Sequence, residues 1–181
     1  MISSDVPVYM IQMSDNKISQ YYKEMVLPSW ENLEYKVHMF EATTPETLGD
    51  MLRFDVLKSK KSNGREFSPT EKAVWYSHLN LWLKCTKPMI IIEHDCMTTA
   101  KFFIQRSLDF KFLSKDKNLS PCNAYFLTPK IANKLIVNAV KNPLTLNTDG
   151  FMYTVCKDEP RGFCCYPIMH PEIGVTIEHY T

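Results

Sequence analysis

The distribution of apolar and polar positions along the chain predicts alternating strands and helices. An apolar run at residues 6–13 predicts a buried strand, and the cap residues Ser14-Asp15-Asn16 predict that a helix follows over residues 17–30. Residues 35–40 alternate and are rich in β-forming side chains, so a second strand is expected there. This order predicts a parallel βαβ unit with a right-handed crossover.

The clearest local signal is a helix start at Ser68. Pro69 at the first helical position and Glu71 three residues after Ser68 give the pattern of a capping box. Mainly apolar positions then recur at helical spacing up to residue 85, and the face that they form is expected to pack on a sheet. His78 lies on this face, where a buried and hydrogen-bonded histidine is the alternative to a functional one.

An apolar run from Met89 to Ile92 follows this helix and ends in Glu93-His94-Asp95. A short, continuous run rich in β-branched residues predicts a central strand covered on both faces, as in a parallel sheet. Ligands of open α/β sheets gather at the carboxyl ends of strands, so Glu93 and Asp95 are candidates for holding a divalent cation. A strand that simply ends in solvated charge is the alternative interpretation.

The remaining segments give weaker patterns. Residues 48–57 predict one short helix, and residues 102–112 predict a helix or irregular structure. Residues 122–127 predict another strand, and Thr128-Pro129 opens a further helix. Asp149 follows that helix in a predicted loop, where it is a candidate base or an ordinary turn residue.

A basic loop extends from Lys58 to Arg65 and contains Asn63-Gly64. Such loops are commonly solvated. The functional alternative is a mobile cover whose cations meet a diphosphate or a nucleic-acid backbone.

Composition narrows the class of protein. The 181 residues, 45% of them hydrophobic, are expected to form a single domain over residues 1–181. A net charge of +1 gives no global attraction to nucleic acid. No apolar stretch approaches the roughly 20 residues of a membrane span, and no signal-like segment begins the chain, so we expect a cytoplasmic protein without stable membrane insertion. The six cysteines lack Cys-x-x-Cys pairing and are expected to be reduced core residues rather than a zinc cluster.

The order of motifs between Glu71 and Asp95 resembles glycosyltransferase family 25, the group of lipopolysaccharide and collagen sugar transferases. The shared features are a Glu at the helix start, a Ser-His pair, a Leu-Trp pair and an isoleucine run into Glu-x-Asp, here Glu71, Ser77-His78, Leu81-Trp82 and Ile90 to Asp95. Later matches to the family pattern are Ala124, Tyr125, Thr128 and Asp149. His94 replaces the family's middle Asp, and Gln12-Met13 stand where the family has a strand end followed by arginines.

This resemblance implies an α/β fold of GT-A type, with a Rossmann-type, mostly parallel sheet and helices on both faces. It implies a nucleotide-sugar donor, taken here as a UDP-sugar, and Mn²⁺ or Mg²⁺ held by Asp95 at the donor diphosphate. Glu93 is then expected to assist catalysis and donor binding through water or the donor ribose, and Asp149 to be the catalytic base. Arg65 and His78 are further candidates for the donor site, and His170 is a candidate for a further metal ligand from the carboxyl-terminal region.

The resemblance thus implies an inverting hexosyl- or pentosyltransferase that moves a sugar to a hydroxyl of a glycan. A hydroxymethylated base in phage DNA is a variant acceptor. A non-catalytic glycosyltransferase-like binding protein is the main alternative; His94 and the missing arginines favour it, whereas the joint presence of Glu93, Asp95 and Asp149 opposes it. A metal-dependent phosphoesterase would need more clustered ligands than the sequence shows.

Overall fold

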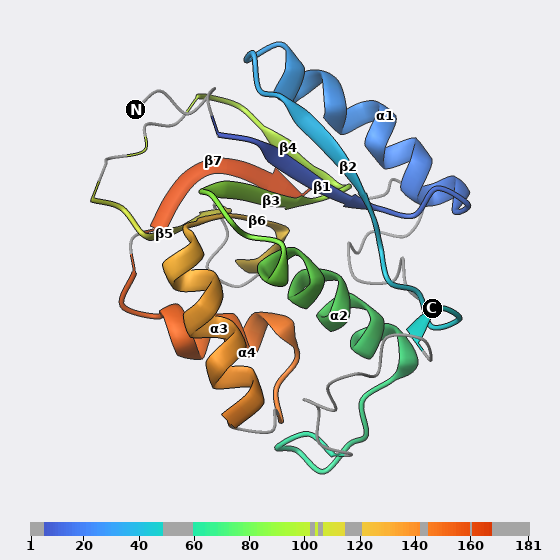
Figure 1. The fold of residues 1–181 in the computed structure, drawn as a ribbon. Coiled ribbons are helices and arrows are strands. Elements are labelled where there is room, and N and C mark those ends of the chain that lie inside the picture. The colour runs from blue at the N-terminus through green and yellow to red at the C-terminus, as the bar shows by residue number, and fades with distance from the viewer. Residues whose placement is uncertain are drawn as a thin grey trace.

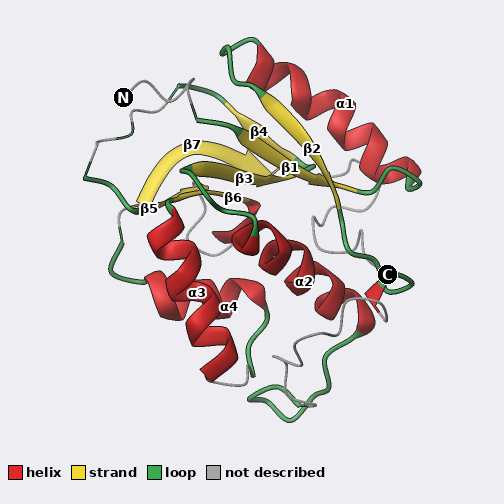
Figure 2. Ribbon diagram, in the orientation of Figure 1, coloured by secondary structure: helices red, strands yellow, loops and turns green. Residues whose placement is uncertain are grey.

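The computed structural model of the chain describes residues 6–48, 60–101, 104, 107–114, 121–141, 145–159 and 161–167. Figure 2 shows a layer of strands with helices above and below it. The strands are β1 Val8–Gln12, β2 Val37–Glu41, β3 Met89–Glu93, β4 Cys96–Thr98, β5 Phe110–Ser114, β6 Ala124–Leu127 and β7 Arg161–Pro167. The helices are α1 Lys17–Glu31, α2 Pro69–Leu83, α3 Pro129–Lys141, α4 Thr148–Cys156 and the short 3₁₀ helix η3 Pro121–Asn123.

The strands form one sheet in the order β2-β1-β3-β6-β5-β7-β4. β1 pairs in parallel with β2 and with β3, so the predicted βαβ unit is confirmed. β6 pairs antiparallel with both β3 and β5, and β7 pairs in parallel with β5 and antiparallel with β4. The predicted α/β fold is therefore confirmed, with a parallel section at β2-β1-β3 and a change of strand direction at β6.

Helices cover both faces of this sheet, as predicted. α1 lies on one face, and α2, α3 and α4 lie on the other (Figure 1). In β3, Ile90 and Ile92 pack in the same cluster as Trp30 of α1, whereas Ile91 packs in the opposite cluster with Trp82 of α2. The isoleucine run is thus buried on both sides, because successive side chains of a strand point to opposite faces.

Two predicted segments differ from the structure. β5 occupies residues that were expected to be helical or irregular, because Phe110 and Phe112 alternate with Lys111 at the period of a strand and face one core cluster. Asp149 lies in the first turn of α4 rather than in a loop, since Asn147 caps that helix by accepting a hydrogen bond from the Gly150 amide. The predicted helix over residues 48–57 lies outside the described residues except for its first residue.

The described cysteines are buried free thiols, as predicted. Five free thiols are buried, those of Cys85, Cys96, Cys122, Cys156 and Cys165. Within the described part of the chain, every helix is too short or too polar to cross a membrane.

The start of α2 has the predicted capping box. The Glu71 amide donates to Ser68 Oγ at 3.1 Å, and the Ser68 amide donates to Glu71 Oε2 at 3.0 Å. The basic loop joins this cap, because Arg65 pairs with Glu71 Oε1 at 2.8 Å and Lys61 pairs with the same oxygen. The cap therefore fixes both the start of the helix and the loop before it.

Replacing Ser68 with Ala removes the side-chain acceptor of this cap. We expect the free energy of unfolding to fall by about 1 kcal/mol, because the Glu71 amide loses its partner. Urea denaturation of both proteins measures the difference. Ser62→Ala changes an exposed serine of the preceding loop and is the matched control, with an expected change within about 0.5 kcal/mol. Equal losses in the two variants would contradict the role of the cap.

Candidate functional site

The carboxyl ends of β1 and β3 lie where the strand order reverses. The chain passes from β1 to β2 at the edge of the sheet and then returns past β1 to β3. The connecting helices α1 and α2 lie on opposite faces (Figure 1). In open α/β sheets, ligands bind outside the carboxyl ends of strands at such a reversal. The fold therefore places its most favourable ligand position beside Glu93.

A small hollow lies at this position between β1, β3 and α2. Its lining residues come from these three elements and from the loop after β2: Ile11, Ala42, Thr43, Val74, Ser77, His78 and Glu93. Its volume of about 10 Å³ gives room for about one water molecule. Ser77 holds α2 against the loop, because its Oγ accepts a hydrogen bond from the Thr43 amide at 2.8 Å and donates to the Ala73 carbonyl at 2.9 Å.

Glu93 ends β3 and borders this hollow. Glu93 is in register with Ile11 of β1, and its side chain is 13% exposed. Glu93 Oε1 lies 3.4 Å from Nε2 of His78. Burial, together with the charge on Asp149, raises the pKa of Glu93 from 4.5 to about 8. The carboxyl group is therefore mainly protonated at neutral pH when no ligand is bound.

His78 is fully buried between α2 and the sheet. Its Nδ1 lies 2.8 Å from the hydroxyl of Tyr125. Burial lowers the pKa of His78 to about 4, although the charge on Asp149 acts in the opposite direction. His78 is therefore neutral at pH 7. It is buried and hydrogen-bonded, which is one of the two interpretations that its position on the apolar face of α2 gave.

Asp95 lies two residues beyond β3 and is 3% exposed. Its Oδ1 is buried and has no hydrogen-bond partner among the described residues. Burial and the charge on Glu93 raise the pKa of Asp95 well above its ordinary value. Asp95 also lies near Tyr22 of α1, whose pKa is raised to about 12 by burial and by the charge on Asp95. A buried carboxylate in these surroundings needs a proton or a cation.

Asp149 reaches the same region through the antiparallel strand β6. Because β6 runs opposite to β3, its first residues, and η3 before them, lie at the carboxyl end of β3. Asp149 Oδ1 accepts a hydrogen bond from the Cys122 amide of η3 at 3.0 Å. This contact ties α4 to η3, and the position of Asp149 is close enough to Glu93 for its charge to raise the pKa of that group.

Asn123 is a site residue that the sequence reasoning missed. It follows Cys122 in η3 and comes directly before Ala124, which is in register with Ile92 of β3. Asn123 is 2% exposed, and its Oδ1 has no hydrogen-bond partner within the part of the chain that the structure describes. Only the antiparallel direction of β6 brings this residue to the end of β3, and the strand pattern at residues 122–127 does not reveal that direction.

The other predicted site residues lie elsewhere or cannot be placed. Arg65 pairs with Glu71 at the start of α2 and is not among the residues that line the hollow. His170 lies outside the described residues. His94 is buried on the α1 side of the sheet, and its ring centroid lies 5.8 Å from that of Tyr22.

The end of β3 offers oxygen atoms of the kind that bind divalent metal ions. Across the described ranges, no group of three or more His, Cys, Asp or Glu side chains is arranged to hold a metal. Asp95 and Asn123 nevertheless offer buried oxygen atoms that lack hydrogen-bond partners in the described residues, and oxygen is the ligand type that Mg²⁺ and Mn²⁺ prefer. Mg²⁺ is commonly held by one or two protein groups together with substrate phosphates.

Comparison with known proteins gives similarities of structure alone. No family of known proteins and no curated protein sequence matches the chain. Mouse xyloside xylosyltransferase 1 is 9% identical with a TM-score of 0.48, over 87% of this chain and 84% of that one. A glycosyltransferase involved in glycosylation of the major capsid of PBCV-1 is 11% identical with a TM-score of 0.48, over 96% of this chain and 98% of that one.

A third similar structure is a putative glucose-1-phosphate thymidylyltransferase from Bacillus anthracis. It is 9% identical with a TM-score of 0.46, over 91% of this chain and 87% of that one. All three TM-scores are below 0.5, so none of these similarities determines the function of this chain.

The buried carboxyl of Glu93 predicts that stability depends on pH. Between its ordinary pKa of 4.5 and its folded value of about 8, the unfolded chain releases this proton while the folded chain retains it, so the free energy of unfolding falls as pH rises. His78 has the opposite effect on the free energy of unfolding, because its pKa is lower in the folded chain, but this effect is confined to pH values below its ordinary pKa of 6.5. We expect Glu93→Gln to become progressively more stable than the parent between pH 6.5 and pH 8.

Urea denaturation at a series of pH values tests this expectation. Glu66→Gln changes an exposed glutamate and is the matched control, for which the difference from the parent stays flat over the same range. A flat difference for Glu93→Gln would contradict the protonated state of Glu93.

Proposed function

We propose that the chain is a glycosyltransferase that moves a sugar from a nucleotide sugar to a hydroxyl group. The observation that supports this proposal is the position of Glu93 and Asp95 at the carboxyl end of β3, beside the reversal of strand order, where the charge on Asp149 acts on Glu93 and the charge on Glu93 acts on Asp95. The resemblance to family 25 supports it, because the Ser-His pair and the Glu-x-Asp strand end that carry the resemblance also border this site.

In this proposal, the donor diphosphate binds at Asp95. Asp95 and Asn123 would hold Mn²⁺ or Mg²⁺ through their buried oxygen atoms, which lack hydrogen-bond partners in the described residues. When bound, the ion neutralises the negative charge of the departing nucleotide, a contribution of several kcal/mol. A cation there also removes the cost of burying the Asp95 carboxylate. A UDP-sugar is the donor that we test first.

Glu93 and His78 lie on the donor side of the proposed site. Glu93 borders the hollow, where it can hydrogen-bond a ribose hydroxyl or a water that occupies the same position. His78 also borders the hollow, but its side chain is almost fully buried and contacts Glu93, so we assign its contribution to donor binding to that carboxyl group.

Asp149 is the proposed catalytic base. In an inverting transfer, the acceptor hydroxyl displaces the nucleotide directly and its proton passes to a carboxylate. Asp149 lies near Glu93, and the hydrogen bond from the Cys122 amide to its Oδ1 holds it at η3. The acceptor that we propose is a glycan hydroxyl; a modified DNA base is the variant, and acceptor binding that weakens steeply with salt would favour it.

A non-catalytic binding protein is the second candidate. The small volume of the hollow beside Glu93 favours it, because about 10 Å³ admits one water rather than a sugar. Release of nucleotide from a nucleotide sugar in the presence of acceptor separates the two candidates, since a binding protein shifts in thermal stability but shows no turnover.

Asp95 is expected to make nucleotide binding dependent on metal. Added UDP-sugar at about 100 times its dissociation constant should stabilise the protein by roughly 2.7 kcal/mol in the presence of Mn²⁺. In Asp95→Asn this metal-dependent part disappears, because the substitution removes the charge that holds the ion. Thermal unfolding with a panel of nucleotides and nucleotide sugars, with and without Mn²⁺, measures the shift.

Asp158→Asn is the matched control for this experiment. It changes an exposed aspartate just after α4, so the metal-dependent shift should equal that of the parent. Absence of a shift with every donor in the parent protein would overturn the donor site, and retention of the full shift in Asp95→Asn would overturn the role of Asp95.

Asp149→Asn tests the proposed base. The amide oxygen of Asn can still accept from the Cys122 amide, so the fold is preserved while the proton acceptor is lost. We expect kcat to fall by about 10²–10⁴-fold with little change in KM for the donor. Steady-state transfer assays measure both constants, and an unchanged kcat would assign Asp149 to the contact between α4 and η3 alone.

A further inference from the structure

We propose that Trp82, Tyr125 and His78 form a directed chain of hydrogen bonds that positions the carboxyl group of Glu93. This role rests on the proposed function, because the carboxyl group that is positioned is the one assigned to the donor site. The three residues come from α2 and β6, and Glu93 comes from β3. The chain of hydrogen bonds therefore joins one helix to two strands behind the site.

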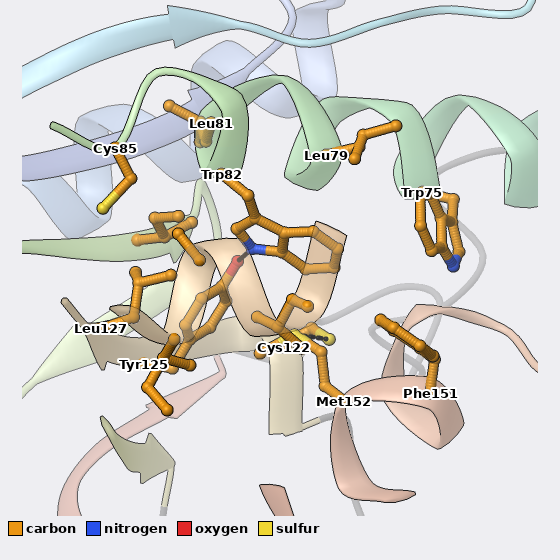
Figure 3. Close-up of a cluster of buried hydrophobic side chains, with 14 of the residues drawn as sticks. Trp75, Leu79, Leu81, Trp82, Cys85, Cys122, Tyr125, Leu127, Phe151 and Met152 are labelled. Carbon is orange, nitrogen blue, oxygen red and sulfur yellow. Dashed lines mark hydrogen bonds between the residues drawn. The ribbon is translucent and has the colours of Figure 1, made fainter. Parts of the chain in front are cut away.

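The first hydrogen bond has a fixed direction. Trp82 Nε1 lies 2.9 Å from the hydroxyl of Tyr125 (Figure 3). An indole nitrogen only donates, so the Tyr125 oxygen is the acceptor. Both side chains are fully buried in the cluster beneath α2, where water does not supply another partner.

The second hydrogen bond follows from the first. Among the described residues, the hydroxyl of Tyr125 has two hydrogen-bond partners, Trp82 and His78. The Tyr125 oxygen already accepts a hydrogen bond from Trp82. Its hydroxyl proton therefore finds an acceptor when it is donated to His78 Nδ1, which lies 2.8 Å away. The opposite arrangement would leave this buried proton without an acceptor, at a cost of about 1–3 kcal/mol.

The tautomer of His78 is then determined. A neutral imidazole that accepts at Nδ1 carries its proton on Nε2. That nitrogen faces Glu93 Oε1 at 3.4 Å, a long hydrogen bond in which His78 donates. The proton-bearing nitrogen is thus aimed at one oxygen of the carboxyl group, which leaves the other oxygen for a ligand.

This arrangement gives Glu93 a defined orientation at the hollow. A buried imidazole has little rotational freedom when both of its nitrogens are hydrogen-bonded, so the carboxyl oxygen that contacts it is held in place. The chemistry that suits the free oxygen is a hydroxyl group of the ligand, such as that of a donor ribose. Tyr125 and Trp82 are positioning residues, since neither lines the hollow.

The first part of the test measures the His78 tautomer by ¹⁵N NMR of the imidazole nitrogens. His78→Gln identifies the signals by removing them. In the parent protein we expect the proton on Nε2, and in Tyr125→Phe we expect that preference to be lost. Tyr35→Phe is the matched control, because it removes the hydroxyl of another buried tyrosine on the opposite face of the sheet, where the ring centroids of Tyr35 and Trp30 lie 5.2 Å apart. It should leave the tautomer of His78 unchanged. A proton on Nδ1 in the parent would contradict the proposed chain of hydrogen bonds. This measurement on the parent is decisive even if Tyr125→Phe does not fold.

The second part measures the affinity for UDP and GDP with Mn²⁺ by calorimetry. We expect Tyr125→Phe to weaken binding about tenfold in the parent background and to have no further effect in Glu93→Gln, because both substitutions remove the same interaction. A tenfold loss in both backgrounds would overturn the positioning role. If the parent binds neither nucleotide, the donor site and the positioning role fail together, whereas the NMR result still decides whether the hydrogen-bond chain exists.

Discussion

The antiparallel pairing of β6 with β3 is the constraint on which the site depends. It places the start of β6 at the carboxyl end of β3, so that η3 and its contact with Asp149 lie beside Glu93. The same pairing sets Tyr125 opposite Ile91, and its hydroxyl then reaches His78 on α2. A parallel β6 would carry these groups to the other end of the strand. The direction of one four-residue strand therefore decides which residues meet.

The site concentrates acidic groups in buried surroundings. Burial raises the pKa values of Glu93 and Asp95; the charge on Asp149 adds to this effect at Glu93, and the charge on Glu93 adds to it at Asp95. Where family 25 has arginines after its first strand, Gln12 instead donates to Glu41 and accepts from Gln20, each at 2.7 Å. These contacts hold the loop after β1 but bring no positive charge. In the absence of a ligand, these buried carboxyl groups destabilise the fold unless they are protonated.

Sequence patterns identified the elements whose signals are local. The capping box at Ser68 and the isoleucine run of β3 follow directly from the residue types and their spacing. The direction of β6 does not, because Ala124–Leu127 is buried at every position and gives the same pattern in either direction. For this reason Asn123 and the hydroxyl of Tyr125 were missed as parts of the site. α4 was missed because Gly150, a poor helix former, lies in its first turn.

The position of β7 has a consequence for how the chain acquires its structure. β4 occurs near the middle of the sequence, yet its partner in the sheet is β7, near residue 165. β7 also lies between β4 and β5, so this half of the sheet has an unpaired edge until β7 arrives. During synthesis on the ribosome, β1, β2, β3, β6 and β5 can pair before β7 emerges, whereas β4 must wait for β7. The nascent protein is accordingly most prone to aggregation just before β7 emerges.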